Sequence, residues 1–120
     1  MNRIILLLAA AAAIPVAAWA QTLLSQSEVE TALRGATFAL TTQGGDTATI
    51  TFHPDMTAEV AMVDGSKDHG TYRFAEGGYC SSWEDFRNGA EACFTVEKIS
   101  DSEFQLYTPD GRKDDRFVRQ

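Results

Sequence analysis

The sequence predicts an all-β fold: a small up-and-down antiparallel barrel of about eight strands, preceded by one short helix. Three observations predict it: apolar residues alternate with polar ones along short segments, turn residues recur at regular spacing, and every connection is short. Short connections favour pairing between successive strands, and closure of the meander removes exposed strand edges. A flattened sandwich is the alternative arrangement.

Residues Met1–Ala20 have the three parts of a cleavable secretory signal. Arg3 is followed by an apolar run over Ile4–Ile14, Pro15 interrupts the run, and Ala18-Trp19-Ala20 supplies small residues for a signal peptidase. The apolar run is shorter than the roughly 20 residues that a membrane span needs. We therefore expect an exported chain, periplasmic or secreted, with an uncleaved anchor as the alternative.

Residues 21–120 would remain after cleavage, which is enough for one domain. Arg3 leaves with the leader, so nine Lys and Arg face 17 Asp and Glu, and the net charge changes from −7 to −8. This acidity repels phosphate backbones and anionic lipid surfaces. We therefore expect neither nucleic acid nor, after cleavage, a membrane as partner, and we expect a monomer.

The short helix is predicted directly after the leader. The segment Ser25–Glu30 holds two overlapping capping boxes, apolar residues then recur at helical spacing as far as Leu33, and Gly35 follows as a terminator. A helix of this length is not stable alone in water. We expect its apolar stripe to pack across one end of the sheet.

Eight segments after Gly35 show the alternation of strands and are separated by turns rich in Gly, Asp and Pro. In chain order they are Thr37–Thr42, Thr47–Phe52, Thr57–Val63, Thr71–Ala75, Tyr79–Asp85, Glu91–Ile99, Glu103–Thr108 and Lys113–Val118. The even spacing gives no sign of a second domain.

The two cysteines of the chain, Cys80 and Cys93, indicate a disulfide, because an exported chain meets an oxidising compartment. Free thiols or half of a metal site are the alternatives. A disulfide that closes a loop of this length stabilises a domain by roughly 3 kcal/mol. Asn88-Gly89 suits a two-residue hairpin turn, but only a hairpin centred near Phe86-Arg87 sets the cysteines opposite each other. We therefore expect a longer loop, about Glu84–Ala90.

No catalytic or metal motif is recognisable. His53 and His69 are interpreted as turn residues in solvent, because no HxH, HExxH or Cys–His cluster accompanies them. The carboxylate pairs Glu84-Asp85 and Asp114-Asp115 should point to opposite faces of a strand, so neither predicts an acid–base dyad. We expect no enzyme, catalytic residue, metal or cofactor. The enzymatic alternative requires both histidines and a carboxylate to meet in space.

Seven aromatic side chains fall at positions that can face the barrel interior. They are Phe38, Phe52, Tyr72, Phe74, Trp83, Phe94 and Phe104. Such residues fill a small barrel or line a pocket for one small apolar ligand. Filling is the default interpretation, and Trp83 most simply packs beside the disulfide.

Gly70–Phe74, Cys80–Trp83, Cys93-Phe94 and Asp110-Gly111 together carry a resemblance. Their pattern of Gly-x-aromatic-x-apolar, Cys-x-x-Trp, Cys-aromatic and a closing Asp-Gly turn resembles the core of small exported bacterial proteins of unknown function, over about residues 24–117. The resemblance implies a periplasmic lipocalin-like barrel and transfers no catalytic residue.

We therefore predict a non-enzymatic periplasmic binding or interaction domain, whose partner is a small apolar ligand in the barrel mouth or a periplasmic protein. The alternative is a protein inhibitor of a secreted protease or lysozyme-type hydrolase, since known inhibitors of this kind include small disulfide-closed barrels. Such an inhibitor would insert Leu23–Ser25 or the Glu84–Ala90 loop into an enzyme cleft.

Overall fold

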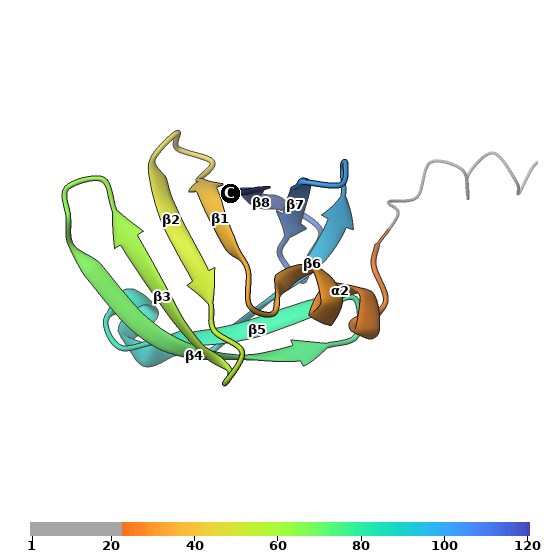
Figure 1. The fold of residues 1–120 in the computed structure, drawn as a ribbon, viewed down its shortest axis with the longest axis horizontal. Coiled ribbons are helices and arrows are strands. Elements are labelled where there is room, and N and C mark those ends of the chain that lie inside the picture. Colours follow the sequence, from red (N-terminus) through yellow and green to blue (C-terminus); the bar gives the residue numbers. More distant parts are fainter. Residues whose placement is uncertain (1–22) are drawn as a thin grey trace, which may run out of the picture.

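The computed structural model describes residues 23–120, so the predicted leader lies outside the described residues. Eight strands form a closed antiparallel barrel in which each strand pairs with the next and β8 pairs with β1 (Figure 1). The predicted meander barrel is confirmed, and the sandwich alternative is wrong. The strands are β1 (Thr37–Thr41), β2 (Thr47–Phe52), β3 (Thr57–Met62), β4 (Lys67–Ala75), β5 (Gly78–Trp83), β6 (Ala92–Lys98), β7 (Glu103–Tyr107) and β8 (Lys113–Arg119).

Helix α2 (Gln26–Leu33) precedes the barrel and packs against one end of it (Figure 1). The first predicted capping box forms: the hydroxyl of Ser25 accepts from the amide of Glu28, whose carboxylate accepts from the amide of Ser25. Val29 and Leu33, which share one face, are fully buried. Their burial supplies the stability that so short a helix lacks alone. Within residues 23–120, no helix is long and apolar enough to cross a bilayer.

The two ends of the barrel differ. At the end covered by α2, the closed end, Arg34 Nε donates to the carbonyl of Pro54 at 3.0 Å and the amide of Gly35 donates to that of Phe52 at 2.7 Å. Alternate turns of a meander lie at opposite ends, so the connections after β1, β3, β5 and β7 border the other end, the mouth. These connections comprise residues 42–46, 63–66, 84–91 and 108–112.

Strand β4 begins four residues before the predicted start, because Lys67–Thr71 pairs with β3. Asp68 and His69 are therefore strand residues, and the prediction that His69 lies in a turn is wrong. Asp68 is only 3% exposed. A buried carboxylate inside a strand is uncommon. The polar Asp68 therefore indicated a turn in the sequence. The prediction that His53 lies in a turn is confirmed, since it precedes the turn after β2.

The disulfide between Cys80 and Cys93 is confirmed, and the two residues face each other in the β5–β6 register. The hairpin is centred where this pairing requires, with the short helix η1 (Phe86–Gly89) inside the connecting loop. Arg87 and Asn88 have φ of 56° and 54°. These left-handed conformations let the longer loop turn back toward the strands.

One hydrophobic core lies inside the barrel and extends beneath α2. Phe38 stacks on Phe117 with ring centroids 5.3 Å apart and meets Phe52 edge to face at 6.1 Å. Of the seven predicted aromatics, five are buried in this core, and Phe74 and Phe94 pack against it half-buried. The five are Phe38, Phe52, Tyr72, Trp83 and Phe104. The prediction omitted three buried aromatics, Tyr79, Tyr107 and Phe117.

Candidate functional site

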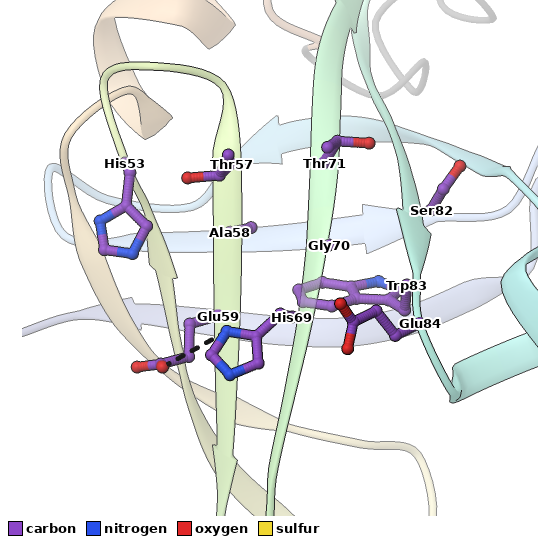
Figure 2. Close-up of a pocket in the computed structure, with 10 residues that line it drawn as sticks. All are labelled: His53, Thr57, Ala58, Glu59, His69, Gly70, Thr71, Ser82, Trp83 and Glu84. Carbon is purple, nitrogen blue, oxygen red and sulfur yellow. Dashed lines mark ion pairs between the residues drawn. The ribbon is translucent and has the colours of Figure 1, made fainter.

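An outer groove of about 660 Å³ lies on the outside of the barrel over β3, β4 and β5 (Figure 2). Most of its lining residues are polar, and half of them are exposed. The lining residues are His53, Thr57, Ala58, Glu59, His69, Gly70, Thr71, Ser82, Trp83 and Glu84. The groove therefore brings both histidines of the chain, together with carboxylates, to one surface.

The pairing of the strands sets how these side chains meet. Glu59 and His69 are register partners, and the carboxylate Oε2 lies 3.6 Å from the imidazole Nδ1 (Figure 2). His53 sits beyond the end of β2, where its amide donates to the carbonyl of Thr57, two positions before Glu59. His69 therefore faces Glu59 across the β3–β4 pair, whereas His53 lies outside the strands.

Close groups of three ligand atoms are rare in the described residues. The sole such group of His, Cys, Asp and Glu side chains within residues 23–120 is Cys80, Glu91 and Cys93. Both of its sulfurs belong to the disulfide and cannot act as thiolates. The carboxylate of Glu91 instead accepts two hydrogen bonds from Arg73, both at 2.9 Å.

The wall between the groove and the barrel interior is thin at Gly70. This residue pairs with Trp83, and the indole occupies the space where a side chain at position 70 would lie (Figure 2). A Cβ atom at Gly70 would lie 2.1 Å from the carbonyl oxygen of Ser82 and 2.9 Å from the indole. Trp83 consequently lines both the outer groove and the interior of the barrel.

A second hollow, the mouth cavity, occupies about 490 Å³ at the mouth of the barrel. Apolar side chains from six strands form most of its wall, and a few polar groups converge on it. The lining residues are Leu40, Thr42, Ile50, Val60, Met62, Tyr79, Ser81, Trp83, Phe86, Arg87, Ala92, Phe94, Asp114, Asp115 and Phe117. A concave apolar hollow with a small set of polar groups is typical of a small-molecule site.

A β-bulge places two carboxylates at this cavity. Gln105 pairs with Arg116 and Tyr107 with Lys113, so Asp114 and Asp115 together face the single residue between Gln105 and Tyr107. An extra residue in one strand breaks the alternation of side chains. Both aspartates therefore line the cavity, whereas strict alternation had set them on opposite faces.

Two amide side chains hold this bulge. Gln105 Nε2 donates to the carbonyls of Asp114 and Asp115 at 3.1 and 3.3 Å. From the turn after β1, Gln43 Nε2 donates to the carbonyl of Asp114 at 2.8 Å. These bonds satisfy backbone groups that the ladder leaves unpaired.

The cavity perturbs the groups that it surrounds. The pKa of the Asp115 carboxyl is raised to about 6, because burial and, to a lesser extent, the neighbouring Asp114 raise it more than the Arg87 guanidinium lowers it. Burial likewise raises the pKa of the Tyr79 phenol, with both aspartates adding to the effect, so the hydroxyl keeps its proton. Perturbed groups in a cleft are characteristic of functional sites.

The β5–β6 loop is fastened over one side of the mouth. The Asp68 carboxylate accepts hydrogen bonds from the amides of His69 and Phe86 at 2.9 Å and, more weakly, from that of Asp85. Burial opposes the charge of Asp68, yet these backbone donors outweigh it and lower the pKa. Arg87 Nη2 donates to the carbonyl of Ser81 at 3.0 Å. The loop therefore presents its side chains to the cavity from a fixed position.

Some of the predicted aromatic site residues line the mouth cavity, and the others pack in or against the core. Trp83 and Phe94 line the mouth cavity, while the other five predicted aromatics do not. The sequence reasoning missed Tyr79, Arg87 and Asp115. Period two along β5 could have identified Tyr79, which shares a face with Trp83, but neither the bulge nor the loop conformation leaves a recognisable local signal.

The comparisons give no relative from which to transfer a role. No family model, no curated protein and no solved structure matches this chain.

Proposed function

We propose that the protein is a non-enzymatic binding domain whose mouth cavity holds a small, largely apolar ligand. The observation that carries the proposal is the cavity itself, about 490 Å³ of mainly apolar wall at the end of the barrel opposite α2. Eight-stranded barrels of this size can hold one small ligand among side chains that otherwise fill the interior. Here the core fills the closed end and leaves the mouth hollow.

We also propose that the protein acts outside the cytoplasm, after removal of Met1–Ala20. The disulfide supports this proposal, because such bonds persist mainly in oxidising compartments. The closed barrel fits the lipocalin-like architecture that the sequence resemblance implies. A carrier or sensor of small molecules in the periplasm would need these features.

The inhibitor alternative has less support from the two segments that it invokes. In the first segment, the amide of Leu24 donates to the carbonyl of Val96 at 3.1 Å, and Leu23 bridges to Glu97. The second segment, the β5–β6 loop, is fastened back onto the barrel by Asp68. Neither segment is a free projection, so we favour the cavity.

Titration with a hydrophobic fluorophore tests the proposal. We expect saturable binding with one site per chain. Ala92 lines the cavity, and Ala92→Phe should fill it and weaken binding at least about tenfold, because the ring competes for the same volume. The matched control is Ala61→Phe: Ala61 neighbours the buried Val60 on β3, so its side chain points to the outer face.

Saturable binding that Ala92→Phe leaves unchanged would contradict the mouth as the site. Unsaturable partitioning by the native protein, with the β-sheet circular dichroism spectrum intact, would contradict ligand binding altogether. Both variants are compared at equal folded fraction, measured by the same spectrum.

A further inference from the structure

Resting on the proposed function, we infer that the ligand is an amphipathic organic cation: a protonated amine on an apolar body, with its ammonium group at Asp114 and Asp115. The apolar body would occupy the hollow, and the cation would lie against the β-bulge. The inference stands on the charge balance of the lining, on a tyrosine hydroxyl that opens into the cavity, and on the aromatic wall.

The charge balance leaves one negative charge to be neutralised. Among the cavity-lining residues, the charged side chains are Asp114, Asp115 and Arg87. No ion pair within residues 23–120 involves either aspartate. Arg87 directs its donors elsewhere, Nη2 to the carbonyl of Ser81 and Nε to that of Ala90 at 3.3 Å. A monovalent cation would balance the lining and give Asp115 a partner.

Tyr79 supplies an independent indication of a ligand. Its side chain is 3% exposed and lines the cavity, and because no buried polar side-chain atom within residues 23–120 lacks a hydrogen-bond partner, its unbonded hydroxyl opens into the cavity. A hydroxyl that opens into an apolar cavity can hydrogen-bond a polar group of a bound molecule. The hydroxyl stands near the two aspartates, which raise its pKa, so a polar group bound between them could be its partner.

The wall favours an organic cation over a metal ion. Trp83, Phe86 and Phe94 present aromatic rings to the cavity, and ring faces attract ammonium groups. A calcium ion needs six to eight oxygen ligands, whereas two adjacent carboxylates beside apolar side chains offer fewer. A ligand with one charged end and a hydrocarbon body matches both parts of the lining.

Calorimetric titration with three probes of equal length tests the inference: octylamine, octanol and octanoate. We expect octylamine to bind at least about tenfold more tightly than octanol, because only the ammonium forms an ion pair with the carboxylates. Octanoate should bind most weakly. Tryptophan fluorescence gives a second readout, since Trp83 is the sole tryptophan of residues 21–120.

Asp115→Asn should remove the preference for octylamine and leave octanol affinity within about twofold of the native value. The matched control is Asp101→Asn at the closed end, where the aspartate is exposed and pairs with Lys98 at 3.2 Å. It should change none of the three affinities. Retained octanol binding shows that the variant cavity is intact.

Acidification gives a test without substitution. Asp115 faces Asp114 on its own strand, Arg87 from η1 and Tyr79 from β5, and none of the other lining residues titrates. Octylamine affinity should fall as the pH drops from 7 to 5, through the pKa of about 6, while octanol affinity stays constant.

The outcomes separate the two proposals. Equal affinity for octylamine and octanol would overturn the cationic ligand and leave the apolar cavity standing. Tightest binding of octanoate would also overturn it and would assign the polar end to Arg87. Failure of all three probes, together with the fluorophore, would overturn the proposed function and this inference with it.

Discussion

The position of the Asp115 side chain lowers the stability of the folded protein. Its carboxyl is partly buried beside a second carboxylate, and the described chain offers it no salt bridge. A charge held this way lowers the stability of the fold, because the unfolded chain would solvate it fully. Such a residue makes physical sense where a bound ligand supplies the missing partner.

Asp115→Asn should therefore stabilise the unliganded protein above neutral pH. Because the folded state raises the pKa from 3.8 to about 6, the folded protein binds this proton more tightly, and stability is lost as the pH rises through that range. Allowing for water at the mouth, we expect the variant to gain about 1–2 kcal/mol at pH 8. The gain should vanish below about pH 4. Urea unfolding at both pH values measures it, and an equal gain at both would contradict the assignment.

The sequence predicted the positions of some side chains in the fold but not those of others. The buried aromatics of the core were predictable, because each sits on the apolar face of an alternating strand. Asp115 was not, because an irregularity in the β7–β8 register redirects it. That irregularity depends on distant contacts from Gln43 and Gln105, which no local pattern encodes.

At the scale of elements, the pairing of β4 with β5 requires a residue without a side chain at position 70. Gly70→Ala would place a methyl group 2.1 Å from the backbone oxygen of Ser82, which cannot move without breaking the ladder. We expect a loss of about 2–4 kcal/mol and a changed Trp83 emission, since the indole must also shift.

The matched control for this prediction is Gly44→Ala, in the turn after β1. The nearest atom to a Cβ there is Thr42 Oγ1 at 3.9 Å, so the substitution should cost almost nothing. Urea unfolding followed by circular dichroism compares the two variants. Equal stability would show that the close approach at Gly70 is not a constraint.

The β5–β6 hairpin is the element that the disulfide secures. Replacing Cys80 and Cys93 together by serine should lower the free energy of unfolding by about 3 kcal/mol, mainly because the unfolded chain gains freedom. Dithiothreitol should destabilise the native protein similarly and leave the double variant unaffected. A reductant effect on the double variant would point to another cause.

Element positions were largely predictable, while the ends of elements were less so. The capping box fixed the start of α2, and the facing cysteines fixed the centre of the β5–β6 hairpin against the attraction of Asn88-Gly89. The start of strand β4 was predicted four residues too late, because aspartate is common in turns and Asp68 therefore indicated a turn. Only the folded chain shows that this carboxylate collects backbone donors from the neighbouring loop.

For the whole molecule, export has a direct test in the intact mass of native protein. We expect a chain that begins at Gln21 and is two hydrogens lighter than its reduced form, because a signal peptidase and an oxidising compartment act on the same molecules. Purification from an extracytoplasmic fraction without reductant supplies the sample. An uncleaved leader, or a mass equal to that of the reduced chain, would contradict the proposal.

The overall topology followed from alternation and short connections, since a meander of eight strands has few arrangements that leave no open edge. The mouth cavity could not be predicted from alternation and short connections. Whether aromatic side chains fill a barrel or only half of it depends on how their volumes add up in space. Here Phe38, Phe52 and Phe117 cluster toward the interior, and the mouth is left hollow.

The pairing of β1 with β8 has a consequence for the order in which the molecule is made. The register that seals the barrel pairs Phe38 with Arg119 and Thr41 with Arg116, so the strand made after the other seven completes the barrel. A chain threaded through a membrane from its N-terminus would keep an open barrel until β8 had crossed. The closed barrel and its mouth cavity would then form only on the far side.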